Sequence, residues 1–209
     1  MRSILPLALL LALRAFPQVG EDTTLVRYHG GMDLREGIYA DLASFRNNRP
    51  TYPLERLMTA QGAPVQDLRK VGGKLRFRPD TGEVVNVDLD AMWGLCNADV
   101  VYIRAGNGFY RIGSMGSLAH VLYEYTYRDW DPYMYPGGSV NRTAQGQFIL
   151  DMATGRMLDL NASNMEAILQ RDPILAEQFA EIPKRKRRAE VLFLYLRRYN
   201  DRHPLYFPR

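Results

Sequence analysis

The chain has 209 residues, of which 46% are hydrophobic and 24% are charged, and its formal net charge is +4 at pH 7. This composition is unlike that of a disordered chain, and the length suffices for a sizeable core. Cys96 is the only cysteine, which excludes an intramolecular disulfide and a cysteine-ligated metal site. We expect Cys96 to be a small buried hydrophobic side chain.

Residues 1–20 have the pattern of a secretory signal peptide. Arg2 precedes an apolar run from Ile4 to Leu13, as in a basic segment followed by an apolar stretch of about 7–15 residues. The run is shorter than the roughly 20 apolar residues that a transmembrane helix needs, so no transmembrane segment is predicted. The sequence therefore predicts export, to the periplasm or the extracellular space. The alternative is a buried apolar helix at the N-terminus.

Beyond the predicted signal peptide, residues 21–36 are polar and show no periodicity, which indicates an extended arm. Residues 37–209 are expected to form a single domain. A short amphipathic helix is predicted from the i, i+4, i+7 spacing of Ile38, Leu42 and Phe45, and it ends before Pro50.

The stretch from Glu83 to Tyr127 predicts the core of this domain. Short β-rich runs are separated by Gly and Asn residues, as expected for an antiparallel meander. Val85 and Val87 alternate with polar residues, which is the period of a half-buried strand. Asn107-Gly108 is a strong hairpin signal because both residues tolerate positive φ. The predicted strands are 83–90, 99–104, 109–112 and 118–127.

Helices are predicted mainly after this sheet. Ser163 has Glu166 at capping-box spacing and can begin one helix. A second helix is expected over 175–182 and a last one from Lys184 to Tyr199, which is apolar around much of its girth. A further hairpin is predicted between them and the meander, over 147–160. The fold class expected is therefore α+β, an antiparallel β-meander core with two or three C-terminal helices packed on it.

Two short signatures resemble those of a family of uncharacterised exported bacterial proteins. The first is an opening, Gly37-Ile38-Tyr39 followed by Phe45-Arg46-Asn47-Asn48-Arg49-Pro50. The second is a core, Trp93-Gly94, then Val101-Tyr102-Ile103, then Phe109-Tyr110. The resemblance covers about residues 37–125 and departs from the family at Leu95-Cys96-Asn97, where relatives have a polar turn. It implies export and a compact β-rich fold, and it carries no catalytic residue or function.

Catalytic motifs are few. The three histidines, His29, His120 and His203, are widely spaced, and no P-loop, dinucleotide-binding or nucleophile-elbow motif is present. His120 is expected to be structural. Asp88 and Asp90 are predicted to share one strand face, where carboxylates could serve a hydrolase or bind a cation, or simply face water. No catalytic residue, metal site or cofactor is predicted.

An aromatic segment is the first candidate binding site. Tyr123, Tyr125 and Tyr127 are predicted to line one strand face, and more aromatic residues follow them. Such rings can stack on a sugar or a peptide with little loss of entropy. The alternative is that the tyrosines face the core. The predicted ligand-binding residues are Tyr125, Tyr127, Trp130, Tyr133 and Tyr135.

A basic run is the second candidate binding site, and it comprises Lys184, Arg185, Lys186, Arg187 and Arg188. Residues 184–209 contain nine Lys or Arg against two acidic residues, a net charge of +7. This asymmetry predicts an anionic partner: an envelope polymer, lipid headgroups or, if the protein is not exported, nucleic acid. The alternative is that the run pairs with the acidic remainder of the same protein.

The sequence thus predicts an exported, soluble protein that acts as a non-enzymatic binding or structural module associated with the cell envelope. Two alternatives remain. One is a hydrolase that uses strand-face carboxylates. The other is a polyanion-binding or nucleic-acid-binding protein that uses the basic C-terminal helix.

Overall fold

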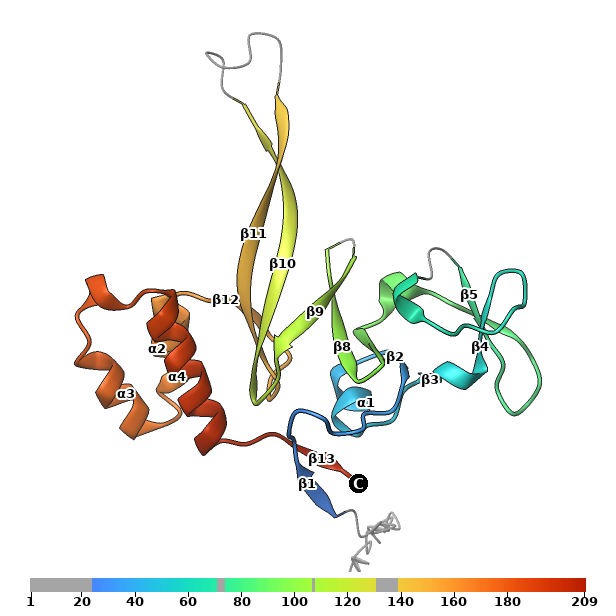
Figure 1. Cartoon of the computed structure of the whole chain (residues 1–209), viewed down its shortest axis with the longest axis horizontal. Coiled ribbons are helices and arrows are strands. Elements are labelled where there is room, and N and C mark those ends of the chain that lie inside the picture. Colours follow the sequence, from blue (N-terminus) through green and yellow to red (C-terminus); the bar gives the residue numbers. More distant parts are fainter. Residues whose placement is uncertain (1–23, 71–73, 107, 131–138) are drawn as a thin grey trace, which may run out of the picture.

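The structure, a computed structural model, describes residues 24–70, 74–106, 108–130 and 139–209. Its centre is an antiparallel sheet of eight strands with helices at one end (Figure 1). Strands β7 to β12 are neighbours in both sequence and space, so the predicted α+β fold with a β-meander core is confirmed. In spatial order the strands are β12 (Met157–Asp159), β11 (Val140–Asp151), β10 (Leu118–Asp129), β9 (Gly108–Ser114), β8 (Val100–Ala105), β7 (Gly94–Asn97), β2 (Gly37–Tyr39) and β3 (Tyr52–Pro53).

A separate three-stranded sheet lies at the end of the molecule away from the C-terminal helices (Figure 1). It contains the strand that was predicted to open the meander, so this prediction is wrong. The strand is shorter than expected because Asp88 caps a 3₁₀ helix directly after Val87. The strands are β4 (Leu57–Thr59), β5 (Leu75–Phe77) and β6 (Val85–Val87), and the 3₁₀ helices of this region are η1 (Leu54–Arg56), η2 (Leu68–Lys70) and η3 (Leu89–Ala91).

The predicted hairpin between β8 and β9 is present, but its turn lies one residue earlier than expected. Ala105 pairs with Gly108, so residues 106 and 107 connect the strands. Gly106 supplies a positive φ of 53°, and Asn107 lies outside the described residues.

Three helices follow the sheet and pack together beside it (Figure 1). The first is capped by Asn161, whose side chain accepts a hydrogen bond from the Asn164 backbone at 2.8 Å. The cap therefore lies two residues before the predicted Ser163. Among the helices of the described residues, none is long and apolar enough to cross a membrane. The predicted first helix was expected to include Ile38, which is wrong, because Ile38 lies in β2 and Asp41 caps the helix. The helices are α1 (Leu42–Arg46), α2 (Ala162–Leu169), α3 (Pro173–Ala180) and α4 (Ala189–Arg202), with the 3₁₀ helix η4 (Lys184–Lys186) before α4.

Three apolar clusters hold these parts together. The central cluster contains Phe45, Cys96 and Val121, the helical cluster contains Leu118 and residues of α2 to α4, and a third cluster lies under the small sheet. Cys96 is fully buried as predicted, and burial raises the pKa of its thiol to about 12, so it is not a reactive thiolate.

The described part of the predicted N-terminal arm is bound to the rest of the fold. Strand β1 (Leu25–Arg27) pairs antiparallel with β13 (Tyr206–Pro208). The Tyr28 ring lies edge-on to Phe207, with ring centroids 6.0 Å apart, and Leu34 is buried in the central cluster. Residues close to the two ends of the described chain therefore form one small sheet.

Replacing Gly37 by alanine should destabilise the protein by about 3 kcal/mol or more. Gly37 has a φ of 145°, and an added Cβ would lie 2.5 Å from the Tyr52 carbonyl oxygen and 2.9 Å from Cβ of Pro50. Gly62 is a matched control, because its φ is also positive, at 87°, but it has nothing within 4 Å of an added Cβ. Gly62→Ala should cost only about 1–2 kcal/mol. Urea unfolding measures both, and equal losses would show that close approach at Gly37 is unimportant.

Candidate functional site

Strands β10 and β11 form a long hairpin that projects from the sheet (Figure 1). They pair along all twelve residues of each strand. Their outer neighbours β9 and β12 pair only with the base of the hairpin. Residues 122–129 and 140–147, which we call the arm, therefore extend beyond the sheet as a two-stranded ribbon.

One face of the arm carries Tyr123, Tyr125 and Tyr127, which we call the tyrosine face. It continues the face on which Ala119 and Val121 are buried in the central cluster at the base of the hairpin. The Tyr123 and Tyr125 rings are nearly parallel, at 20°, with centroids 6.0 Å apart, and the next centroid lies 6.2 Å further on. The rings thus form a row along the ribbon.

The three tyrosines differ in how far the core covers them. Tyr123 is partly buried and packs against Tyr110 and Phe148, with ring centroids 4.6 and 5.6 Å away. Tyr125 and Tyr127 are 41% and 42% exposed. The alternative that the tyrosines face the core therefore holds for Tyr123 only, because the core ends where the arm begins.

Small residues on β11 give the aromatic rings of this face room to pack. Gly146 lies opposite Tyr123, and Ala144 lies opposite Tyr125. A Cβ on Gly146 would come within 2.7 Å of the Phe148 ring and 3.5 Å of the Tyr125 ring. These small positions were not singled out from the sequence, although their alternation along β11 is visible there.

Polar interactions fix the remainder of the arm. Arg142 lies opposite Tyr127, and its Nε donates to Asp129 in an ion pair of 2.8 Å. On the opposite face, the Gln145 amide donates to the Glu124 carboxylate at 2.8 Å. The tyrosine face therefore ends in an ion pair beyond Tyr127, and the opposite face carries the hydrogen bond between Gln145 and Glu124.

Of the other three predicted aromatic residues, the structure describes only Trp130. Trp130 directly follows β10 and is 69% exposed. Tyr133 and Tyr135 lie outside the described residues. Of the predicted ligand-binding residues, the structure therefore places Tyr125 and Tyr127 beside each other on one face of β10. Among the described residues, the Trp130 ring makes no ring contact with either of them.

The basic run lies before the last helix and not within it. Lys184 begins the 3₁₀ helix η4, and Arg188, at φ −86° and ψ 178°, is the N-cap of α4. The predicted start of the helix at Lys184 is therefore wrong, because the extended backbone at Arg188 separates the two helices. Four of the five cations are exposed, namely Lys184, Arg185, Lys186 and Arg188.

Arg187 is the exception, because its side chain is only 5% exposed. Its Nε donates to the Ile182 carbonyl at 2.9 Å, and its Nη2 donates to the Ala180 carbonyl at 3.2 Å. Its Nη1 forms an ion pair of 3.1 Å with Glu166, and its guanidinium lies 4.5 Å from the centroid of the Phe179 ring. The self-pairing alternative thus applies to Arg187.

The carboxylates considered for a hydrolase do not share a strand face, so this prediction is wrong. Strand β6 ends at Val87, and Asp88 accepts a hydrogen bond from the Asp90 backbone at 3.0 Å. Asp90 is in turn paired with Arg104. Both line a pocket of about 600 Å³, of which His120 is not a lining residue. Within the described residues, no cluster of three His, Cys, Asp or Glu side chains could hold a metal ion.

His120 is buried at the base of the hairpin, 6% exposed, with its ring edge-on to Phe193 of α4 at 4.5 Å. Its Nε2 is buried without a hydrogen-bond partner among the described residues. Burial lowers the pKa of His120, and a hydrogen bond with Gln147 opposes this shift only partly. The structural role predicted for His120 agrees with this position.

A buried acid that the sequence analysis did not single out connects α3 and α4. Asp172 is 2% exposed and accepts hydrogen bonds from Arg202 at 2.5 Å and from the Leu175 backbone at 3.2 Å. Its carboxylate also lies 2.8 Å from Nε2 of His203. The hydrogen bond from Arg202 holds the pKa of Asp172 well below its usual range, so this acid stays charged and structural.

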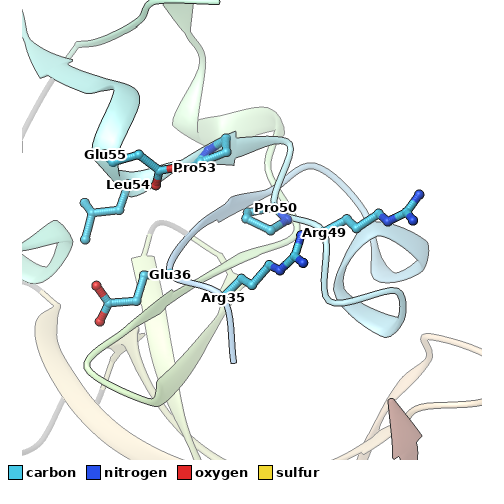
Figure 2. Close-up of a pocket in the computed structure, with 7 residues that line it drawn as sticks. All are labelled: Arg35, Glu36, Arg49, Pro50, Pro53, Leu54 and Glu55. Atoms are coloured by element: carbon cyan, nitrogen blue, oxygen red, sulfur yellow. The ribbon is translucent and has the colours of Figure 1, made fainter. Parts of the chain in front are cut away.

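A pocket of about 530 Å³ lies beside β2 and β3 (Figure 2). Asn48, at a positive φ of 49°, shapes it by accepting a hydrogen bond from the Arg35 backbone at 2.8 Å. Directly after Glu36, Gly37 approaches the Tyr52 carbonyl so closely that a Cβ would not fit. None of the pocket's lining residues is a serine, cysteine or histidine, so it offers charged and apolar contacts only. The pocket is lined by Arg35, Glu36, Arg49, Pro50, Pro53, Leu54 and Glu55.

Replacing Arg187 by glutamine should lower the free energy of unfolding by about 2–4 kcal/mol, because two carbonyls and a carboxylate lose a charged donor. Arg185→Gln is the matched control, since Arg185 is exposed two residues away and should change stability by less than about 0.5 kcal/mol. Denaturant unfolding of both variants tests this. Similar stabilities would contradict the internal role of Arg187.

The stability of the protein should fall with decreasing pH in part because of His120. The unfolded state binds a proton below about pH 6.5, whereas the buried ring resists protonation. This contribution is therefore complete above about pH 6.5 and is lost as the pH falls below it. A His120→Gln variant should show a smaller loss in thermal unfolding at acidic pH. His29→Gln, at an exposed position, is the control and should keep the wild-type profile; identical profiles for all three proteins would refute the prediction.

Comparisons with known proteins add no assignment. Neither protein-family models, nor curated proteins, nor solved structures give a match to this chain. The resemblance to exported bacterial proteins therefore stays a prediction. What the protein binds has to be inferred from its own surfaces.

Proposed function

We propose that this chain is an exported, non-enzymatic binding module of the cell envelope, and that the tyrosine face of the arm holds a polysaccharide. The observation that carries the proposal is the row of rings at 6.0 and 6.2 Å spacing on a ribbon that projects from the fold. Export is supported by the signal-like pattern of residues 1–20.

The chemistry of the face favours an uncharged, extended ligand. Tyrosine offers a flat apolar surface and a hydroxyl that can hydrogen-bond at its edge, and sugar rings present both apolar CH faces and hydroxyls. The charges at this level of the arm, Arg142 and Asp129, are paired with each other. A row of rings suits a polymer with repeated rings better than a compact ligand.

The base of the arm supports this role by fixing the row in place. Tyr123 is held between Tyr110 and Phe148, and the Tyr110 hydroxyl donates to the Glu124 carbonyl at 3.0 Å. Tyrosine also loses little entropy on binding because it has only two side-chain torsions. The exposed rings are thus partly pre-organised for a ligand.

Replacing both Tyr125 and Tyr127 by alanine should weaken binding to polysaccharide by about tenfold or more, because two stacking surfaces are lost. Co-sedimentation with insoluble cell-wall polysaccharide, and affinity electrophoresis in soluble neutral glycans, measure the effect. Thermal unfolding should change little, since both rings are about two-fifths exposed.

Tyr206→Ala is the matched control, because Tyr206 is 41% exposed but lies on β13 and not on the arm. It should bind as the wild type does. Binding of the wild type to none of the glycans, or binding of an extended peptide along the arm instead, would defeat the proposal.

A further inference from the structure

We propose that the four exposed cations of the basic run, Lys184, Arg185, Lys186 and Arg188, dock the protein on the surface of a bilayer rich in anionic phospholipid. We call these four residues the basic corner. This inference concerns a different surface from the tyrosine face, and it stands independently of polysaccharide binding.

The basic corner has a fixed position because Arg187 holds its backbone. Arg187 joins the turn to carbonyls at the C-terminal end of α3, at Ala180 and Ile182, and to Glu166 on α2. Cations are favoured at a helix C-terminus by the helix dipole. The Arg187 side chain thus faces inward and is fully used in internal contacts, while the side chains of the other four cations are exposed.

The four outward cations make no direct ion pair with a carboxylate in the described part of the protein. None of them forms an ion pair, a side-chain hydrogen bond or a cation–π contact there, although other cations do. Arg56, for example, pairs with Asp80 at 2.8 Å, and Arg69 pairs with Asp67 at the same distance. The prediction that the run pairs with the protein's own acidic surface therefore fails for these four positions.

The position of Arg188 adds a second observation. As the N-cap of α4 it makes no side-chain capping hydrogen bond, although Ser, Thr, Asp or Asn at this position would make one. A cation there also opposes the helix dipole. The fold therefore retains a cation where a neutral or acidic residue would stabilise the helix more, which is expected when the charge serves a partner.

The shape of the charge distribution favours a lipid surface over nucleic acid. Proteins that follow a nucleic-acid backbone place cations along a groove or a stripe. Here the four cations lie within five residues, and Glu190 interrupts the charge in the first turn of α4. Short segments with about four to eight Lys and Arg residues can bind anionic headgroups, and the basic corner has four such residues.

Vesicle co-sedimentation of the protein as its cell produces it tests this inference. Large vesicles of phosphatidylcholine with phosphatidylglycerol are compared with vesicles of phosphatidylcholine alone, at two salt concentrations. A second arm measures binding to duplex DNA. The test variant replaces the four residues of the basic corner by glutamine. The control variant removes the same charge from four exposed, scattered arginines: Arg27, Arg76, Arg111 and Arg156.

We expect the wild type to bind the anionic vesicles, and binding to weaken as salt rises, because the attraction is screened. Each cation near an anionic surface is worth about a fivefold change in binding. The basic-corner variant should therefore bind at least about tenfold more weakly, and the scattered-charge variant should stay close to the wild type.

Four outcomes would overturn the inference. They are equal binding to neutral and anionic vesicles, equal loss in both variants, absence of vesicle binding by the wild type, and binding to DNA without binding to vesicles. Both variants keep Arg187, so each is expected to fold, and circular dichroism with thermal unfolding verifies this before the comparison.

Discussion

The pairing of β10 with β11 is the constraint on which the remainder of the structure depends. At the base of the hairpin both faces are covered: Val121 faces the central cluster, whereas Leu118 and Ile149 face the helices. Asn200 of α4 fixes this arrangement, because its side chain both donates to and accepts from the Leu118 backbone at 2.8 Å. The paired strands β10 and β11 therefore join the central cluster to the helical cluster.

Beyond the base of the hairpin, β10 and β11 continue to pair, although neither the central cluster nor the helical cluster covers them there. Their side-chain alternation is unchanged, so the face that buries Val121 below presents Tyr125 and Tyr127 above. Burial in a core is the usual reason for aromatic residues on a strand face, and it does not account for these exposed tyrosines. A two-stranded ribbon alone is only marginally stable in water, and here the buried base supplies the stability of the whole hairpin.

The helical end shows a related division of roles within a few residues. Arg187 and Asp172 are almost fully buried and connect neighbouring helices through charged hydrogen bonds. Lys184 to Lys186 lie directly beside Arg187 in sequence, yet their side chains face water. The internal pairs fix how the external charges are displayed, so stability and surface chemistry arise from the same short segment.

Local pattern sufficed for much of this protein. The sequence by itself determined the α+β class, the strands β8 to β10 of the meander, the hairpin of residues 147–160, the burial of Cys96 and the row of tyrosines on one strand face, because strand alternation and turn residues act over short distances. It predicted neither strand β7 nor residues 140–146 of β11. It could not decide which tyrosines the core reaches, that Arg187 faces inward among five similar cations, or that the strand before Asp88 belongs to a separate sheet. Those outcomes depend on contacts between residues far apart in the chain. Only the tertiary structure decided them. Packing determines how far the arm extends beyond the core, and packing also places the Ala180 and Ile182 carbonyls within reach of Arg187. No local sequence pattern contains this information.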